Sequence, residues 1–205
     1  MKAKALSDLQ KASADLQNLV SAFKPEQFNS VPFEGSWTAG QVAEHILKSY
    51  SGVLEVISDQ AAPTERKPDE KIEAIKDLFL NFDTKMSSPD FVLPSAPPHN
   101  QQTLLKESND LLAKMTAVIT SQDLSATYNA FELPGFGKFT RLEWVYFLIY
   151  HQQRHNHQLN NIYQKIILFS LQDFIKHYNE NKIIITFCSF NFTKLYVGFG
   201  RNSCQ

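Results

Sequence analysis

Apolar residues recur every three or four positions over four long stretches of the chain, and this spacing predicts four amphipathic α-helices. The stretches are 6–23, 38–59, 101–120 and 141–167. A shorter helical pattern at 69–82 lies in the connection between the second and third stretches. Four long helices with one long crossover connection predict an all-α four-helix bundle.

The predicted second helix has a clear start signal. Thr38 and Gln41 have the spacing of a capping box, in which the hydroxyl and the amide satisfy free N–H groups at the helix start. Pro25 follows the first helix and Pro63 follows the second, so each has a stop signal. The bundle is expected to form one domain over residues 5–168.

The end of the chain has a different pattern. Residues 183–199 are β-branched and aromatic with few charges, which is typical of one or two strands or of an aggregation-prone extension. A helical bundle offers no sheet for such strands to join. We therefore expect residues 169–205 to be a poorly packed C-terminal extension.

Composition narrows the class of protein. With 43% apolar residues among 205 the chain can build a core, and 20 basic residues nearly balance 21 acidic ones. A net charge of −1 gives no sign of a nucleic-acid partner or a membrane surface. We expect no signal peptide and no transmembrane helix, because no apolar segment is long enough. Both cysteines, Cys188 and Cys204, come late in the chain, which is consistent with a reducing, cytoplasmic location.

Candidate chemistry centres on two histidines in the predicted fourth helix. His151 and His155 follow the apolar run 144–150 and stand four residues apart, so they share one helix face at about 6 Å along the axis. Such a pair can bind one divalent ion such as Zn, Ni or Fe. Ordinary buried histidines remain the alternative, since the spacing also arises by chance. Gln152 replaces the glutamate base of a metalloprotease HExxH motif.

A third histidine interrupts the apolar stripe of the second helix. If the second and fourth helices are neighbours or diagonal partners, His45 can meet the other two, and three imidazoles with an open position are typical of a catalytic metal site. Gln158 and Glu44 are candidates to act around the ligands, although no catalytic residue is identified. Ser49 and Gly52 are expected to line a cavity above the metal.

The three remaining histidines have ordinary interpretations. His99 is in a proline-rich loop, His157 points away from the ligand face, and His177 is near the chain end. No fourth ligand is found on the two stripes. A site closed by four protein ligands, as in structural zinc centres, is therefore not expected.

Two segments resemble motifs of the DinB-like superfamily. Residues 37–49, WTAGQVAEHILKS, are similar to the start of its second helix, and the stretch from 133 to 159 is similar to its last helix. The motifs occur in the family's order, and the resemblance covers about residues 5–167. It implies a four-helix bundle with one long crossover. It also implies that His45, His151 and His155 are three metal ligands, while His157 and the tail depart from the family pattern.

The resemblance further implies a choice of reactions on a small-molecule substrate. Members of the superfamily include metal-dependent hydrolases and transferases that use a low-molecular-weight thiol, such as bacillithiol or mycothiol. Residues 1–168 contain no cysteine, so a thiol would come from outside, and no carboxylate is plainly placed as a base for water. A homodimer is plausible from the family only. The alternative is a non-catalytic, stress-linked binding or dimerisation module, because a fold does not by itself transfer a reaction.

Overall fold

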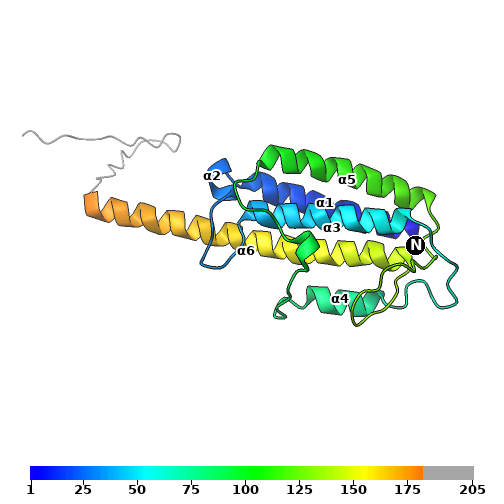
Figure 1. Cartoon of the computed structure of the whole chain (residues 1–205). Helices are drawn as coiled ribbons and strands as arrows, with labels where there is room; N and C mark the ends of the chain where they lie inside the picture. The colour runs from blue at the N-terminus through cyan, green and yellow to red at the C-terminus, as the bar shows by residue number, and fades with distance from the viewer. Residues whose placement is uncertain (182–205) are drawn as a thin grey trace, which may run out of the picture.

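This computed structural model describes residues 1–181, and these residues contain seven helical segments. Four of them are long and lie alongside one another as a bundle (Figure 1). These are α1 (Lys2–Ala22), α3 (Ala39–Ser58), α5 (Gln101–Ser121) and α6 (Arg141–Asn181). The shorter elements are α2 (Pro25–Phe28), α4 (Ile72–Leu80) and the 3-10 turn η1 (Asp90–Val92). The predicted all-α four-helix bundle is confirmed.

Helices α3 and α6 are neighbours in the bundle. Each of α1 and α3 packs against both α5 and α6, so α1 lies diagonally opposite α3. A long crossover, residues 59–100, leaves the end of α3 and returns to the start of α5. Helix α4, within this crossover, packs on the outside of α6 (Figure 1). A three-histidine site needs these two helices to be neighbours or diagonal partners, and the structure makes them neighbours.

Helix α6 continues past its predicted end at residue 167 to Asn181. No glycine or proline occurs between 141 and 181, so the local sequence lacks the usual residues that end a helix. The added turns project beyond the other helices (Figure 1). They carry the exposed apolar side chains Leu168, Phe169, Leu171, Phe174 and Ile175. The strands expected at 183–199 lie outside the described residues, and the domain boundary at 168 stays a prediction.

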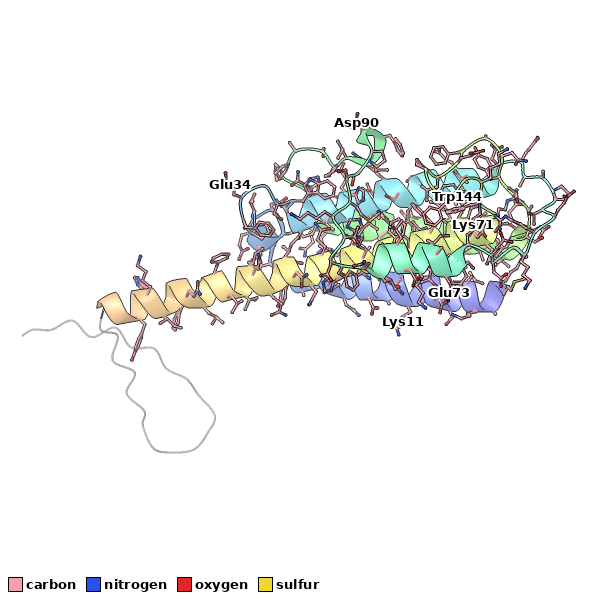
Figure 2. The ribbon with its side chains drawn as sticks, turned by 90° about the horizontal axis from the view of Figure 1, so that it is seen from below. Lys11, Glu34, Lys71, Glu73, Asp90 and Trp144 are labelled. Atoms are coloured by element: carbon pink, nitrogen blue, oxygen red, sulfur yellow. The ribbon has the colours of Figure 1, made fainter. Side chains whose placement is uncertain are left out.

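A buried ion pair fixes the start of α6. The Glu143 side chain is 0% exposed and accepts two hydrogen bonds from the Arg66 guanidinium, at 2.6 and 2.5 Å. It also accepts the backbone N–H of Lys71 at 2.9 Å and of Thr140 at 2.8 Å. Hydrogen bonding to this carboxylate raises the pKa of Arg66. Lys71 and Trp144 mark this region in Figure 2. The bonds of Glu143 to Arg66 and Lys71 tie α6, the helix that carries His151 and His155, to the crossover.

We expect Glu143→Ala to lower the free energy of unfolding by about 3 kcal/mol, because Arg66 and two N–H groups lose a buried acceptor. Urea denaturation of the variant and the wild type measures this difference. Glu73→Ala is the control, since Glu73 is 76% exposed and pairs with Lys76 at 3.1 Å. Its loss should stay below about 0.5 kcal/mol. An equally small loss for Glu143→Ala would contradict the structural role of the buried pair.

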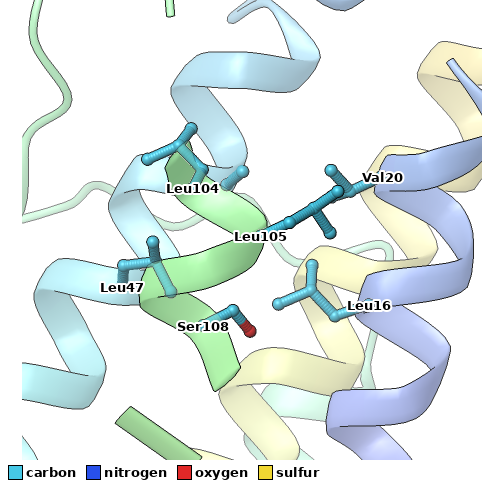
Figure 3. Close-up of a pocket in the computed structure, with 7 residues that line it drawn as sticks. Leu16, Val20, Leu47, Leu104, Leu105 and Ser108 are labelled. Atoms are coloured by element: carbon cyan, nitrogen blue, oxygen red, sulfur yellow. The ribbon is translucent and has the colours of Figure 1, made fainter. Parts of the chain in front are cut away.

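Apolar side chains from all four long helices fill the interior of the bundle. Its largest fully buried members include Leu9, Ile46, Met115, Ile119 and Leu148. A small pocket remains between α1, α3 and α5, lined by Leu16, Val20, Leu47, Leu104 and the polar Ser108 (Figure 3). No side chain of α6 lines it, so this void is separate from the histidines and reflects packing of the core.

Candidate metal centre

Three histidines meet where α3 packs against α6. The Nε2 atom of His151 is 3.1 Å from Nε2 of His45 and 3.1 Å from Nε2 of His155. All three side chains are buried, with exposed fractions of 1% for His45 and 9% for each of the other two. The structure thus brings together the three histidines that the sequence singled out, each offering a ring nitrogen to the same point.

Hydrogen bonds fix the orientation of two of the rings. The Nδ1 atom of His45 is 2.8 Å from the carbonyl oxygen of Val92, and Nδ1 of His155 is 2.8 Å from Oε1 of Gln158. Both oxygens are acceptors, so each Nδ1 carries the proton and donates it. In the neutral rings, the Nε2 atoms of His45 and His155 then present bare electron pairs toward His151.

The third ring is held by apolar contacts. His151 stacks parallel to Phe147 at a centroid distance of 5.8 Å and meets the edge of Phe79 at 5.7 Å. Its Nδ1 atom is buried without a hydrogen-bond partner. A single N–H on Nε2 of His151 can satisfy only one of the two electron pairs that face it. The cluster therefore has more acceptors than donors, which is unfavourable in a buried site unless a cation is present.

The nitrogen positions also suit a divalent ion. Two imidazole nitrogens bound to one zinc ion at about 2.1 Å stand about 3.0 to 3.4 Å apart for ordinary coordination angles. The observed separations of 3.1 Å match this spacing. Three neutral imidazoles are a donor set for zinc, nickel or iron, so the residues present fit the ion that the sequence predicted.

Burial keeps all three histidines neutral near physiological pH. It lowers the pKa of His45, and it lowers the pKa of His155 to about 4 with help from the neighbouring His45. Burial, followed by the adjacent His155 and His45, lowers the pKa of His151 well below its usual value. The electron pairs are therefore free of protons at neutral pH, where a metal ion would meet little competition.

The two other candidates from the sequence lie in different places. Gln158 contacts the cluster by accepting from Nδ1 of His155, so its contact is with a histidine ring. Glu44 instead faces the crossover, where it accepts from the Ser95 N–H at 2.6 Å and lies 3.0 Å from Nε2 of His99. Partial burial acts to raise the pKa of Glu44, but these hydrogen bonds and Lys48 lower it overall. The structure does not bring Glu44 into contact with the three histidines.

The remaining histidines stay outside the cluster. His99 packs against Gly40 so closely that a Cβ atom at that glycine would lie 2.9 Å from Cβ of His99. His157 is exposed and stacks on Phe82 with ring centroids 4.0 Å apart. His177 is exposed on the part of α6 that projects from the bundle.

Three other polar or small residues have local roles. Ser49 donates to the carbonyl of His45 at 3.0 Å within α3, and Gly52 is exposed, so neither shows the expected role of lining a cavity. Gln152 accepts from the hydroxyl of Tyr50 in the bundle interior. Burial raises the pKa of Tyr50, so this phenol stays neutral. Gln152 therefore faces away from the histidines on either side of it in the sequence.

Sequence reasoning missed neighbours of the cluster, among them Phe79 beside His151 and both Val92 and Trp37 beside His45. The Val92 carbonyl gave no signal, because every residue has a backbone carbonyl. Trp37 lies with its ring 5.2 Å from that of His45, and its place directly before the capping box was the only available hint.

Within residues 1–181, no helix has both the length and the apolar character needed to cross a membrane.

Comparisons with known proteins agree with this fold. A family model of the DinB superfamily matches residues 8–159. The uncharacterized protein YuaE of Bacillus subtilis (strain 168) is 21% identical over 163 residues, which cover 78% of this chain and 98% of YuaE. YfiT from Bacillus subtilis, described as a probable metal-dependent hydrolase with an unusual four-helix bundle topology, is 17% identical with a TM-score of 0.52. That match covers 80% of this chain and 87% of YfiT.

A further solved structure, the four-helix bundle protein TT2238, is 21% identical with a TM-score of 0.48, over 78% of this chain and 99% of that chain. The family match is the stronger finding, because it spans most of the chain and includes all three histidines. The chain belongs to the DinB superfamily.

Proposed function

We propose that this protein is a metal-dependent hydrolase of a small-molecule substrate, with a divalent ion held by His45, His151 and His155. The observation that carries this proposal is the convergence of three neutral, buried Nε2 atoms with separations of 3.1 Å around His151. A divalent ion held there would lower the pKa of a water molecule to about 7 at its open position. The fold shared with YfiT, a probable metal-dependent hydrolase, supports the reaction class.

The residues around the cluster have definite parts in this proposal. Val92 and Gln158 accept hydrogen bonds from the Nδ1 atoms of His45 and His155. Each bond fixes its ring and makes the Nε2 electron pair a stronger ligand for a metal ion. Phe79 and Phe147 hold the ring of His151 and supply an apolar wall. Among residues 1–181, no fourth histidine, cysteine or carboxylate joins the group, so a bound ion would keep coordination positions that the protein does not fill.

One observation favours a second function, thiol-dependent transfer. In the described part of the chain, none of the three histidines has a carboxylate among its hydrogen-bond partners, so a general base for water is not evident. A thiol needs no such base, because metal coordination itself favours the thiolate. Residues 1–168 contain no cysteine, so the thiol would be an external one of low molecular weight, such as bacillithiol or mycothiol.

The test compares metal-loaded and chelator-treated protein, purified without a histidine tag. Protein loaded with one equivalent of Zn, Ni or Fe(II) is assayed with esters and amides, and separately with an electrophile plus a low-molecular-weight thiol. We expect hydrolysis that requires the metal and no thiol. Turnover only with the thiol would instead establish the transferase. Metal binding without either reaction would favour the non-catalytic module, and absence of metal binding would contradict both enzyme proposals.

A further inference from the structure

We propose that three side chains of α3, Gln41, Glu44 and Lys48, are positioning residues for His45. They act by holding residues 92–95 of the crossover, which we call the strap, against the three-histidine cluster. The inference rests on the proposed metal site and extends it to residues that touch neither the ion nor the substrate.

All three side chains bind the strap from one face of α3. Lys48 donates from Nζ to the carbonyl of Leu93 at 2.7 Å, and Gln41 donates from Nε2 to the carbonyl of Ser95 at 3.2 Å. Glu44 accepts the Ser95 N–H at 2.6 Å and the Ser95 hydroxyl at 3.1 Å. Positions 41, 44 and 48 are three and four residues apart, so their side chains line up along the helix.

The strap begins with the residue that orients His45. Val92 is 8% exposed and directs its carbonyl oxygen to Nδ1 of His45 at 2.8 Å. The side chains next to it bury little, since Phe91 is 74% exposed and Leu93 is 40% exposed. Apart from the buried side chain of Val92, apolar packing therefore contributes little to the position of this segment. Asp90 lies at the outer edge of the molecule in Figure 2. The polar bonds from α3 therefore help to place the Val92 carbonyl, together with burial of the Val92 side chain.

The consequence falls on the ring of His45. With the carbonyl of Val92 in place, the proton stays on Nδ1 and Nε2 is free to bind a metal ion. Without it, the proton can move to Nε2, or the ring can rotate away from His151. Loss of a partner that orients a metal ligand typically lowers metal affinity by about 10- to 100-fold. The strap thus links three polar residues on the surface of α3 to the metal site.

The experiment uses the double variant Glu44→Ala/Lys48→Met in the full chain. The matched control is Asp110→Ala/Lys106→Met, which removes a second i,i+4 pair, 3.5 Å apart, on the exposed face of α5. Zinc affinity is measured by competition with a chromophoric chelator, and the tautomer of His45 is measured by ¹⁵N NMR on metal-free protein. We expect the strap variant to bind zinc about 10- to 100-fold more weakly and to lose the Nδ1–H tautomer of His45. The control should match the wild type in both measurements.

Other outcomes separate this proposal from the proposed function. If the strap variant keeps wild-type zinc affinity and the Nδ1–H tautomer, the α3 contacts only stabilise the crossover, and the positioning role is overturned. If the wild type itself binds no zinc, the proposed function fails, and the NMR comparison on metal-free protein still decides whether the strap orients His45. Circular dichroism is the folding control, and both variants should keep their helices. Gln41→Leu provides a second strap variant, although it also removes a helix-capping contact.

Discussion

His151→Ala is expected to abolish stoichiometric metal binding while the bundle stays folded. Its Nε2 atom is the central one of the cluster, 3.1 Å from the Nε2 atoms of both His45 and His155. Without it, two imidazoles remain, and we expect affinity for zinc to fall by about 1,000-fold, since a metal site with so few protein ligands is rarely stable. Mass spectrometry of protein purified without a histidine tag should give about one equivalent for the wild type and nearly none for the variant.

The fold should survive this substitution, because two effects on the free energy of unfolding oppose each other. Removing the ring leaves a cavity beside Phe79 and Phe147, which is destabilising by about 2 kcal/mol. It also removes a buried Nδ1 atom that has no hydrogen-bond partner, which offsets part of that loss. Circular dichroism should therefore show nearly unchanged helicity. His157→Ala is the matched control on the same helix, because His157 is exposed and lies outside the cluster. Full metal content in His151→Ala, or its loss in His157→Ala, would contradict the proposed site.

The sequence predicted most of the bundle because residues at the helix ends carry local signals, such as side chains that cap free N–H groups. The capping box at the start of α3 is present, with Gln41 N–H donating to the Thr38 hydroxyl at 3.1 Å. Asn100 likewise caps α5 by accepting the N–H of Thr103 at 2.9 Å. The end of α6 was predicted too early because no such signal exists there, and the predicted end followed the last residues of the apolar pattern.

The candidate site was predictable only in part. The apolar stripes placed His45, His151 and His155 on core-facing arcs, but a stripe does not say which helix is its neighbour. The order of motifs and the resemblance to a family supplied that step, and the packing of α3 on α6 confirms it. The position of Glu44 was out of reach, because its partners Ser95 and His99 lie about 50 residues away in a crossover without periodicity.

Acid should destabilise the metal-free protein steeply, because the three histidines are buried without charge. In the unfolded chain each imidazole takes up a proton near pH 6.5, whereas His155 in the folded protein does so only at about pH 4. Between these values the unfolded state binds more protons, so the free energy of unfolding falls as pH falls. His155 alone accounts for roughly 3 kcal/mol over this window, and the lowered pKa values of His45 and His151 act in the same direction. Above pH 6.5 both states are neutral at these positions, and the effect vanishes.

Urea denaturation of metal-free protein at pH 7.5, 6 and 5 measures this dependence. The wild type also contains many carboxylates that titrate in acid, so the informative quantity is its difference from His155→Gln, which lacks one of the buried imidazoles. The decline of the variant should be shallower by about 1.2 kcal/mol between pH 6 and 5. His157→Ala should follow the wild type, because His157 is exposed and lies outside the cluster. Parallel curves for His155→Gln and the wild type would show that His155 is not held neutral.

A bound ion would stabilise the folded state further. One equivalent of zinc should therefore raise the free energy of unfolding of the wild type most at pH 7.5 and progressively less toward pH 5, because protons compete for the same three nitrogens.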